Sequence, residues 1–460
     1  MSVAAAPTTR PGPNHRPGPP PPPQSGRGRR LGGTRRLLFV LGAISMAITV
    51  GLSAYIGVTS AALRSGLDTI GQQSAPLVKA SSDLYFALNS MDQQAADVLL
   101  VGTDPGLSDS RTYALNAYQE SEVAAEDALR QIAADAPNDP NIQGIADSTA
   151  DRIGQYKALV TEAFLLNQQG GDPAGKPSAQ VLTLYRQATD SMQVILTEVQ
   201  GMTNSSSDQL NSIYDSQRAS TSLAEVLLIV FGAISIGCLV VVQILLVRRV
   251  RRWLNPALAV ATVIALGVTV LGASMVANEN HQLFVAKSQA FDSIITLSQA
   301  RSTGYDATAD ESRFLIDPQR RPQYQADFQS KSQTVSKQLD AEMNNITFAG
   351  EQTAANKMLA AYQKWQGDDQ HMRSLVDSGN LTAATNFVIN DTPGNAFYDF
   401  IQYDIALFGT SQINQAAFDG AISNADSSVS GWTATIPAVT GLLIIGLIAL
   451  GLWPRIAEYR

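Results

Sequence analysis

Hydrophobic residues are concentrated in four blocks of the chain. These blocks are residues 37–62, 223–247, 257–277 and 432–453. Each is long enough for an α-helix, which rises about 1.5 Å per residue, to cross a hydrocarbon layer of about 30 Å. A helix on the surface of a soluble protein would carry a polar stripe, which these blocks lack. The pattern therefore predicts four transmembrane helices, with a cleaved signal peptide as the alternative for the first block.

The long segment between the first two blocks, residues 63–222, has a helical periodicity instead. Apolar and small side chains recur every three or four positions from Leu67 to Val98 and again from Val181 to Ile213. Turn signals separate the periodic stretches at residues 102–105, 137–140 and 170–173. Pro76 is expected to interrupt the first helix. Four helices joined by short turns are typical of an antiparallel bundle.

Residues 278–431 repeat this plan between the third and fourth blocks. The stretch 118–129 (YQESEVAAEDAL) matches 328–339 (FQSKSQTVSKQL) in length, with Gln second and Leu last in both. An extra short helix is expected at residues 381–390. The sequence thus predicts an all-α fold, in which four transmembrane helices carry two tandem extracytoplasmic four-helix bundles.

Charge fixes the expected orientation. Arginines cluster in residues 1–36, 248–256 and 454–460, next to the apolar blocks, and such clusters mark the cytoplasmic side. Residues 63–222 hold 20 acidic against 9 basic residues, and residues 278–431 hold 18 against 10. We therefore expect a multi-pass plasma-membrane protein with both termini in the cytoplasm. The Pro-rich tail should be disordered, and either lies on anionic membrane lipids or docks a partner.

Patterns that carry catalysis or bind metals are missing from the sequence. There are one cysteine, Cys238, and three scattered histidines, so neither a disulfide nor a metal cluster can be assembled. Residues 170–177 imitate a phosphate-binding loop, but Pro177 stands where a Ser or Thr must hold magnesium, which favours a turn. The sequence predicts no enzyme, no catalytic residue, no cofactor, no metal and no nucleic-acid partner.

The densest polar cluster on a predicted helix lies in residues 305–317 (YDATADESRFLID). Asp310 and Arg313 share one helical face at 3–4 spacing and could pair at the surface. One interpretation is a solvated, salt-bridged face. The other is a contact surface for a ligand or partner, where the arginines would suit a carboxylate. The candidate binding residues are Arg301, Tyr305, Asp306, Asp310 and Arg313.

The short basic loop between the second and third blocks supplies a second set of candidates. We expect this loop to relay a signal in the cytoplasm, because long helices would carry a change to it from the outer domains. Its candidate residues are Arg248, Arg249, Arg251 and Arg252.

The doubled arrangement, the linker 248–256 (RRVRRWLNP), the stretch 305–317 and the Pro-rich tail resemble actinobacterial glutamine-sensor membrane proteins of the GlnX type. That resemblance implies that an extracytoplasmic amino-acid-binding lipoprotein delivers the signal. It also implies that a soluble cytoplasmic serine/threonine kinase, which controls glutamate and 2-oxoglutarate metabolism, receives it. The bundles also resemble chemoreceptor and sensor-kinase input domains, although only seven residues, 454–460, follow the last block.

A transmembrane sensor that couples an extracytoplasmic amino-acid signal to that kinase is the first functional hypothesis. The alternative is a cell-envelope scaffold that recruits partners without sensing a ligand. A transport channel is disfavoured, because the apolar blocks carry no clear set of polar pathway residues. Whether the protein forms a homo-oligomer is left open.

Overall fold

The computed structural model describes residues 28–250 and 255–457, and within these ranges it contains helices and turns but no strand. This confirms the predicted all-α fold. The α-helices are α1 (Gly28–Thr69), α2 (Ala75–Val101), α3 (Ser108–Asp135), α4 (Pro140–Gly170), α5 (Ala179–Val250), α6 (Pro256–Phe284), α7 (Asp292–Ile316), α8 (Arg321–Asn344), α9 (Glu351–Asp377), α10 (Leu381–Ile389), α11 (Ala396–Val429) and α12 (Thr435–Ala457). Two π-helical segments, η1 (Ile70–Ser74) and η3 (Val285–Phe291), and a 3₁₀ turn, η2 (Pro105–Leu107), lie between them.

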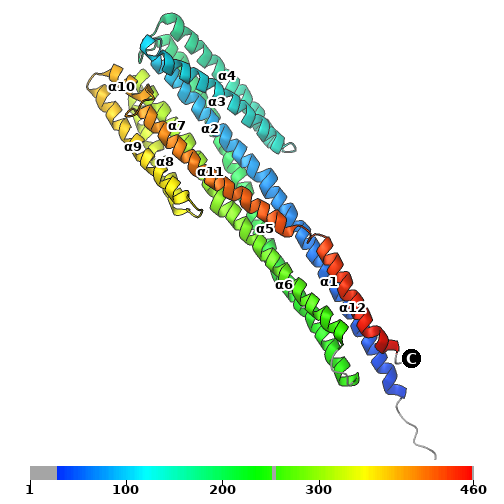
Figure 1. Ribbon diagram of the computed structural model, residues 1–460. Coiled ribbons are helices and arrows are strands. Elements are labelled where there is room, and N and C mark those ends of the chain that lie inside the picture. The colour runs from blue at the N-terminus through cyan, green and yellow to red at the C-terminus, as the bar shows by residue number, and fades with distance from the viewer. Residues whose placement is uncertain (1–27, 251–254, 458–460) are drawn as a thin grey trace, which may run out of the picture.

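Within the described residues, four helices are long and apolar enough to cross a membrane. They contain the first three predicted blocks, and α12 covers the fourth block from Thr435 onward. The apolar parts of α1, α5, α6 and α12 gather at one end of an elongated molecule (Figure 1). The start of α1, the end of α5, the start of α6 and the end of α12 all lie at that end. Most of the predicted tail, residues 1–27, lies outside the described residues.

The apolar end of the molecule is hydrophobic outside as well as inside. Leu239, Ala261 and Ile448 are buried in a core that α1, α5, α6 and α12 share. On the outer surface, Leu442 is 70% exposed and Trp453 is 76% exposed. A helix that shows apolar side chains in every direction fits a lipid environment better than water.

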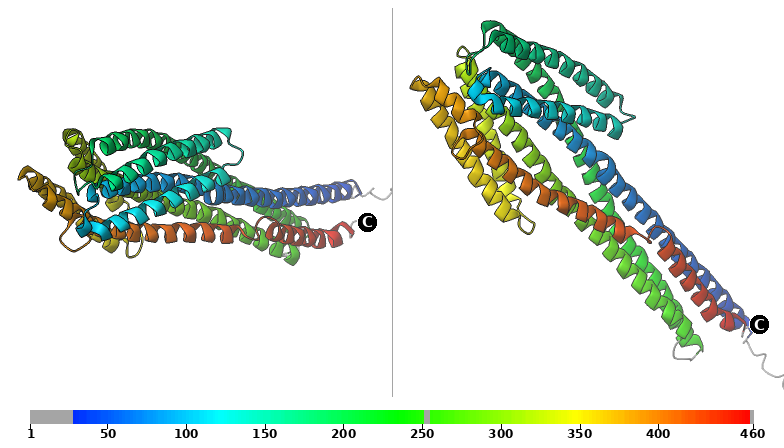
Figure 2. Two further views of the ribbon diagram at one scale, coloured as in Figure 1. Left: turned by 90° about the horizontal axis from the view of Figure 1, so that it is seen from above. Right: turned by 45° about the horizontal axis from the view of Figure 1, so that its top comes forward.

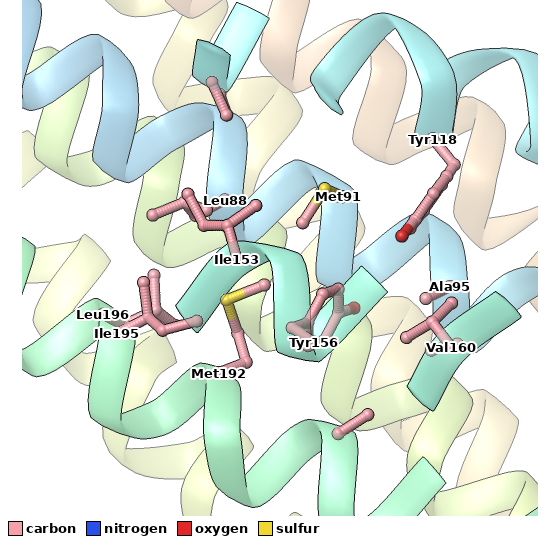
Figure 3. Packing of buried hydrophobic residues seen from close by; sticks show 14 of the residues in the cluster. Leu88, Met91, Ala95, Tyr118, Ile153, Tyr156, Val160, Met192, Ile195 and Leu196 are labelled. Carbon is pink, nitrogen blue, oxygen red and sulfur yellow. The ribbon is translucent and has the colours of Figure 1, made fainter. Parts of the chain in front are cut away.

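Helices α2, α3, α4 and α5 form the first helical group. Their buried side chains meet in one core, in which Met91 of α2 lies near Tyr156 of α4 and Met192 of α5 (Figure 3). The predicted turns are confirmed: α2 ends at Gly102 (φ 61°), α3 gives way to α4 at Pro140, and Gly171 (φ 64°) ends α4. Positive φ favours glycine, which has no Cβ to clash.

Helices α7, α8, α9 and α11 form the second helical group. Aromatic rings dominate its core, where Trp365 of α9 packs against Phe400 and Tyr403 of α11. The expected extra helix at 381–390 is confirmed as α10. Descent of the two groups from one repeated unit stays a prediction.

The two groups meet along α2 and α7, which pack side by side in the part of the molecule away from the apolar end (Figure 2). Every residue from 87 to 101 of α2 is buried, and so is every residue from 307 to 317 at the end of α7. Their apolar core is continuous, because Phe314 and Leu315 of α7 pack into the core of the first group. The two groups are therefore packed together rather than separate.

A π-helical segment lies at two of the places where a membrane-length helix enters a helical group, between α1 and α2 and between α6 and α7. η1 joins α1 to α2 immediately before Pro76, so the interruption predicted there is confirmed. Proline has no N–H to donate to an α-helical partner, and the wider π spacing accommodates this gap. η3 joins α6 to α7 without a proline. Instead, the Asn345 side chain donates to the carbonyl oxygens of Ser288 (3.4 Å) and Gln289 (3.1 Å) and to Ser293 Oγ (2.9 Å).

Candidate functional site

Arg313 of α7 is at the centre of a buried charge network between the two helical groups. Its guanidinium pairs with Asp92 of α2, donates to Asp310 Oδ1 (2.7 Å) and donates to Tyr185 Oη of α5 (3.3 Å). The Arg313 side chain is only 1% exposed. A buried guanidinium is tolerated only when it is paired and its donors are satisfied, and this arrangement meets both conditions.

Lys331 of α8 supplies the second positive charge of the network. Its Nζ lies 2.6 Å from Asp310 Oδ2 and 2.8 Å from Asp306 Oδ1. Burial pushes the pKa of Asp306 up, but Lys331 and Arg313 outweigh it and hold that pKa below its usual value. For Asp310 the effect of burial is larger than that of the same two cations, so its pKa is raised. The carboxylates thus depend on their cations to remain charged.

Asp92 connects the network to the far side of the first group. Tyr156 Oη of α4 donates to Asp92 Oδ1 (2.9 Å). Burial raises the pKa of Asp92, although the adjacent Arg313 lowers it. One cluster of side chains therefore ties α2, α4 and α5 to α7 and α8.

Two further contacts join the same helices on either side of this cluster. Asp97 of α2 accepts hydrogen bonds from Ser312 of α7 and from Gln93, and burial raises the pKa of Asp97 to about 7. Arg186 of α5 forms a two-pronged pair with Asp317, at 2.5 and 2.8 Å. Such bidentate pairs fix geometry as well as charge.

Arg301 and Tyr305 belong to a different cluster, about two to three helical turns from Arg313 along α7 and nearer the apolar end. Arg301 pairs with both carboxylate oxygens of Asp404 on α11, at 2.5 and 2.8 Å. Tyr305 Oη donates to the same carboxylate at 3.2 Å. The guanidinium also lies 3.9 Å from the centre of the Phe86 ring of α2. This cluster too bridges the two helical groups.

The structure confirms the Asp310–Arg313 pair but corrects its location. The predicted solvated face is wrong, because Asp310 and Arg313 are each 1% exposed. Residues of α2 and α8 cover these two side chains and bond to them. The physical reason is that α7 packs between helices on several sides, which periodicity along one helix does not reveal. Ligand or partner binding at these five residues stays a prediction.

The sequence analysis missed the partners of these residues, namely Asp92, Lys331 and Asp404. A signal for Asp92 exists, since a carboxylate directly follows Met91 on the otherwise apolar and small-residue seam of α2. Its pairing with Arg313, 221 positions away, could not be read from local spacing.

The expected relay residues lie at the other end of the molecule. Arg248 and Arg249 are in the last turn of α5, while Arg251 and Arg252 lie outside the described residues. In the described part of the chain, no group of three or more His, Cys, Asp or Glu side chains could hold a metal ion. The charged side chains of the network are bonded to one another, an arrangement suited to holding helices in register.

The geometry defines a class of protein: helical, with four apolar helices that fit a membrane and two helical groups joined by buried charge. Residues 66–215 match the family model described as "Actinobacterial sensor domain". The match spans 150 of the 460 residues, from the end of α1 into α5, and so covers the first helical group. No curated protein and no solved structure matches the chain. The match supports a sensing role in an actinobacterial sensor protein.

Proposed function

We propose that the protein is a transmembrane sensor that couples an extracytoplasmic amino-acid signal to a cytoplasmic serine/threonine kinase controlling glutamate metabolism. A solute-binding lipoprotein delivers the signal to the helical groups. The Arg-rich connection between α5 and α6 passes it to the kinase. The sensor-family match and the resemblance to glutamine sensors of the GlnX type support this proposal.

The observation that carries the proposal is the way helices lead from the apolar end to the charge network. α1 runs through η1 into α2, α6 runs through η3 into α7, and α5 extends unbroken over 72 residues. The Arg313 network lies where α2, α5 and α7 meet. A small change in how these helices pack would therefore displace their membrane ends, as in sensors that signal by shifting one helix against another.

The proposed orientation puts both helical groups outside the cell and both termini in the cytoplasm. It is supported by the arginines beside the apolar blocks and by the acidic balance of the long segments. Reporter fusions at residues 130, 250 and 340 test it. A cytoplasmic signal at 130 or 340 would overturn the orientation and, with it, the direction of signalling.

The function itself is tested by capture and by deletion. Capture of the full chain from membranes should recover a solute-binding lipoprotein and a kinase, and deletion should abolish the phosphorylation response to amino acids. Replacing Arg248 and Arg249 with glutamine should abolish that response while lipoprotein capture persists. Recovery of neither partner, together with an intact response after deletion, would refute the sensor. Removing residues 1–36 distinguishes a scaffold, which would mislocalise its partners and leave phosphorylation unchanged.

A further inference from the structure

A cavity of about 170 Å³ lies where α2 of the first helical group faces α7 and α11 of the second. It is separate from the buried Arg313 network. Its polar lining residues include Lys79, Asp83, Arg301 and Ser411. Its apolar lining includes the rings of Phe86 and Phe408. A concave site with apolar walls and a few convergent polar groups is the usual form of a small-molecule pocket.

Arg301 is held rigidly at the wall of this cavity. Asp404 accepts from its Nε and Nη2, and the Phe86 ring stacks against the guanidinium plane at 3.9 Å. The pair with Asp404 uses Nε and Nη2, so the third nitrogen, Nη1, stays outside that pair. A guanidinium fixed by a carboxylate and a ring, with one nitrogen outside the pair, is preorganised to bind a carboxylate.

Asp83 provides a negative charge at the rim of the cavity. Asp83 pairs with Lys79 at 2.6 Å, and both side chains are about half exposed, at 53% and 49%. An exposed pair of this kind contributes little to stability and exchanges partners easily. Because Arg301 is balanced by Asp404 and Lys79 by Asp83, the site has no net charge when Asp404 is counted together with the lining. It therefore favours a ligand that is neutral overall but carries both signs.

We propose that this cavity binds a small zwitterion, a neutral α-amino acid, directly. Its carboxylate bonds to Arg301 Nη1, its ammonium group bonds to Asp83, and its side chain packs against Leu407 and Phe408 of the apolar lining. The cavity volume of about 170 Å³ suits a small amino acid. The proposal rests on the proposed function for its biological meaning, and it gives the amino-acid signal a site on this chain.

Binding there would act on the arrangement of the helices. The ligand would touch α2 on one side and α7 and α11 on the other, and so would favour the packing in which these helices are close. Both α2 and α7 continue, through η1 and η3, into membrane-length helices.

The test is calorimetric titration of the purified full chain with L-serine, L-glutamine and L-leucine, alongside succinate and butylamine. At least one neutral amino acid should bind, and the two single-sign probes should bind at least tenfold more weakly, because a charge-assisted hydrogen bond is lost. Binding by none of the amino acids, or equal binding of succinate, would overturn the proposal.

Two variants locate the site without touching the Arg301–Asp404 pair. Ser411→Trp fills the cavity from α11, and Asp83→Asn removes the expected ammonium partner. Each should weaken binding at least tenfold. The matched controls, Ser423→Trp on an exposed part of α11 and Asp127→Asn in an exposed ion pair of α3, should bind as the unaltered chain does. Unaltered affinity in Ser411→Trp would overturn the site.

The outcomes also separate the site from the proposed function. If no amino acid binds but deletion of the chain still abolishes the kinase response, the cavity is overturned and the sensor stands. If binding follows the variants but deletion leaves the response intact, the binding site stands and the sensor falls.

Discussion

Replacing Arg313 with methionine tests whether the buried network holds the two helical groups together. The network contains three carboxylates, Asp92, Asp306 and Asp310, and two cations, Arg313 and Lys331, so it carries one net negative charge. Arg313→Met increases the net negative charge of the network from one to two, while Asp92 and Asp310 stay buried. Removing one partner of a buried ion pair costs about 3–5 kcal/mol, because the charge left behind is uncompensated.

Hydrogen exchange of the full chain in lipid discs measures this loss of stability locally, at the amides of α2 and α7. Amides of α2 and α7 should exchange roughly a hundredfold to several-thousandfold faster, since exchange from a local opening follows its free energy. Arg130→Met is the matched control. Its pair with Asp127 is 77% and 56% exposed, and exposed pairs contribute at most about 1 kcal/mol.

A compensating change separates charge from packing. Adding Asp92→Asn to Arg313→Met returns the network to one net negative charge, and should recover at least about 1 kcal/mol of the loss. The reasoning is refuted if Arg313→Met speeds exchange of α2 and α7 no more than Arg130→Met does. It also fails if the double variant is no more protected than Arg313→Met.

Three further predictions concern other parts of the second group and the turns. Asn345→Ala should lower the local stability of η3 by about 1–2 kcal/mol, which faster exchange of the η3 amides would report. Asn344→Ala should not, because the Asn344 side chain bonds only within α8. Burial raises the pKa of Glu342 from 4.5 to about 7, so the folded chain keeps a proton that the unfolded chain releases. Stability should therefore fall as pH rises from about 4.5 to 7, and Glu342→Gln should remove part of that slope in thermal unfolding at a series of pH values; an unchanged slope would contradict this. Gly102→Ala should lower the unfolding temperature more than Gly171→Ala, because a Cβ at Gly102 would lie 2.5 Å from the Asp172 carbonyl oxygen whereas Gly171 has open space around it; equal shifts would count against the clash.

Local features of the fold could be predicted because local chemistry determines them. Glycine and proline end helices through their own backbone restrictions, so the turns after Val101 and Gly170 and the interruption at Pro76 were visible in the sequence. The four apolar blocks could also be predicted, because length and hydropathy alone suffice to identify them.

The site could be predicted only in part, because burial depends on what packs from elsewhere in the chain. The pairing of Asp310 with Arg313 follows from 3–4 spacing on one helix. That both are buried follows from α2, whose polar residues face α7 across more than 200 positions of sequence. A periodic pattern in the sequence identifies one buried face of a helix. It does not show that residues 87–101 of α2 and 307–317 near the end of α7 are buried on every face.

The two π-helical segments have a mechanical consequence. A π turn holds about one residue more than an α turn, so η1 and η3 each keep a spare residue between a membrane-length helix and its helical group. If that residue passes along the helix, the parts on either side rotate by about 100° and slide by about 1.5 Å relative to each other. Twist and piston displacement are then a single screw motion with a fixed pitch, so a cross-link that blocks rotation at η1 or η3 must also block sliding.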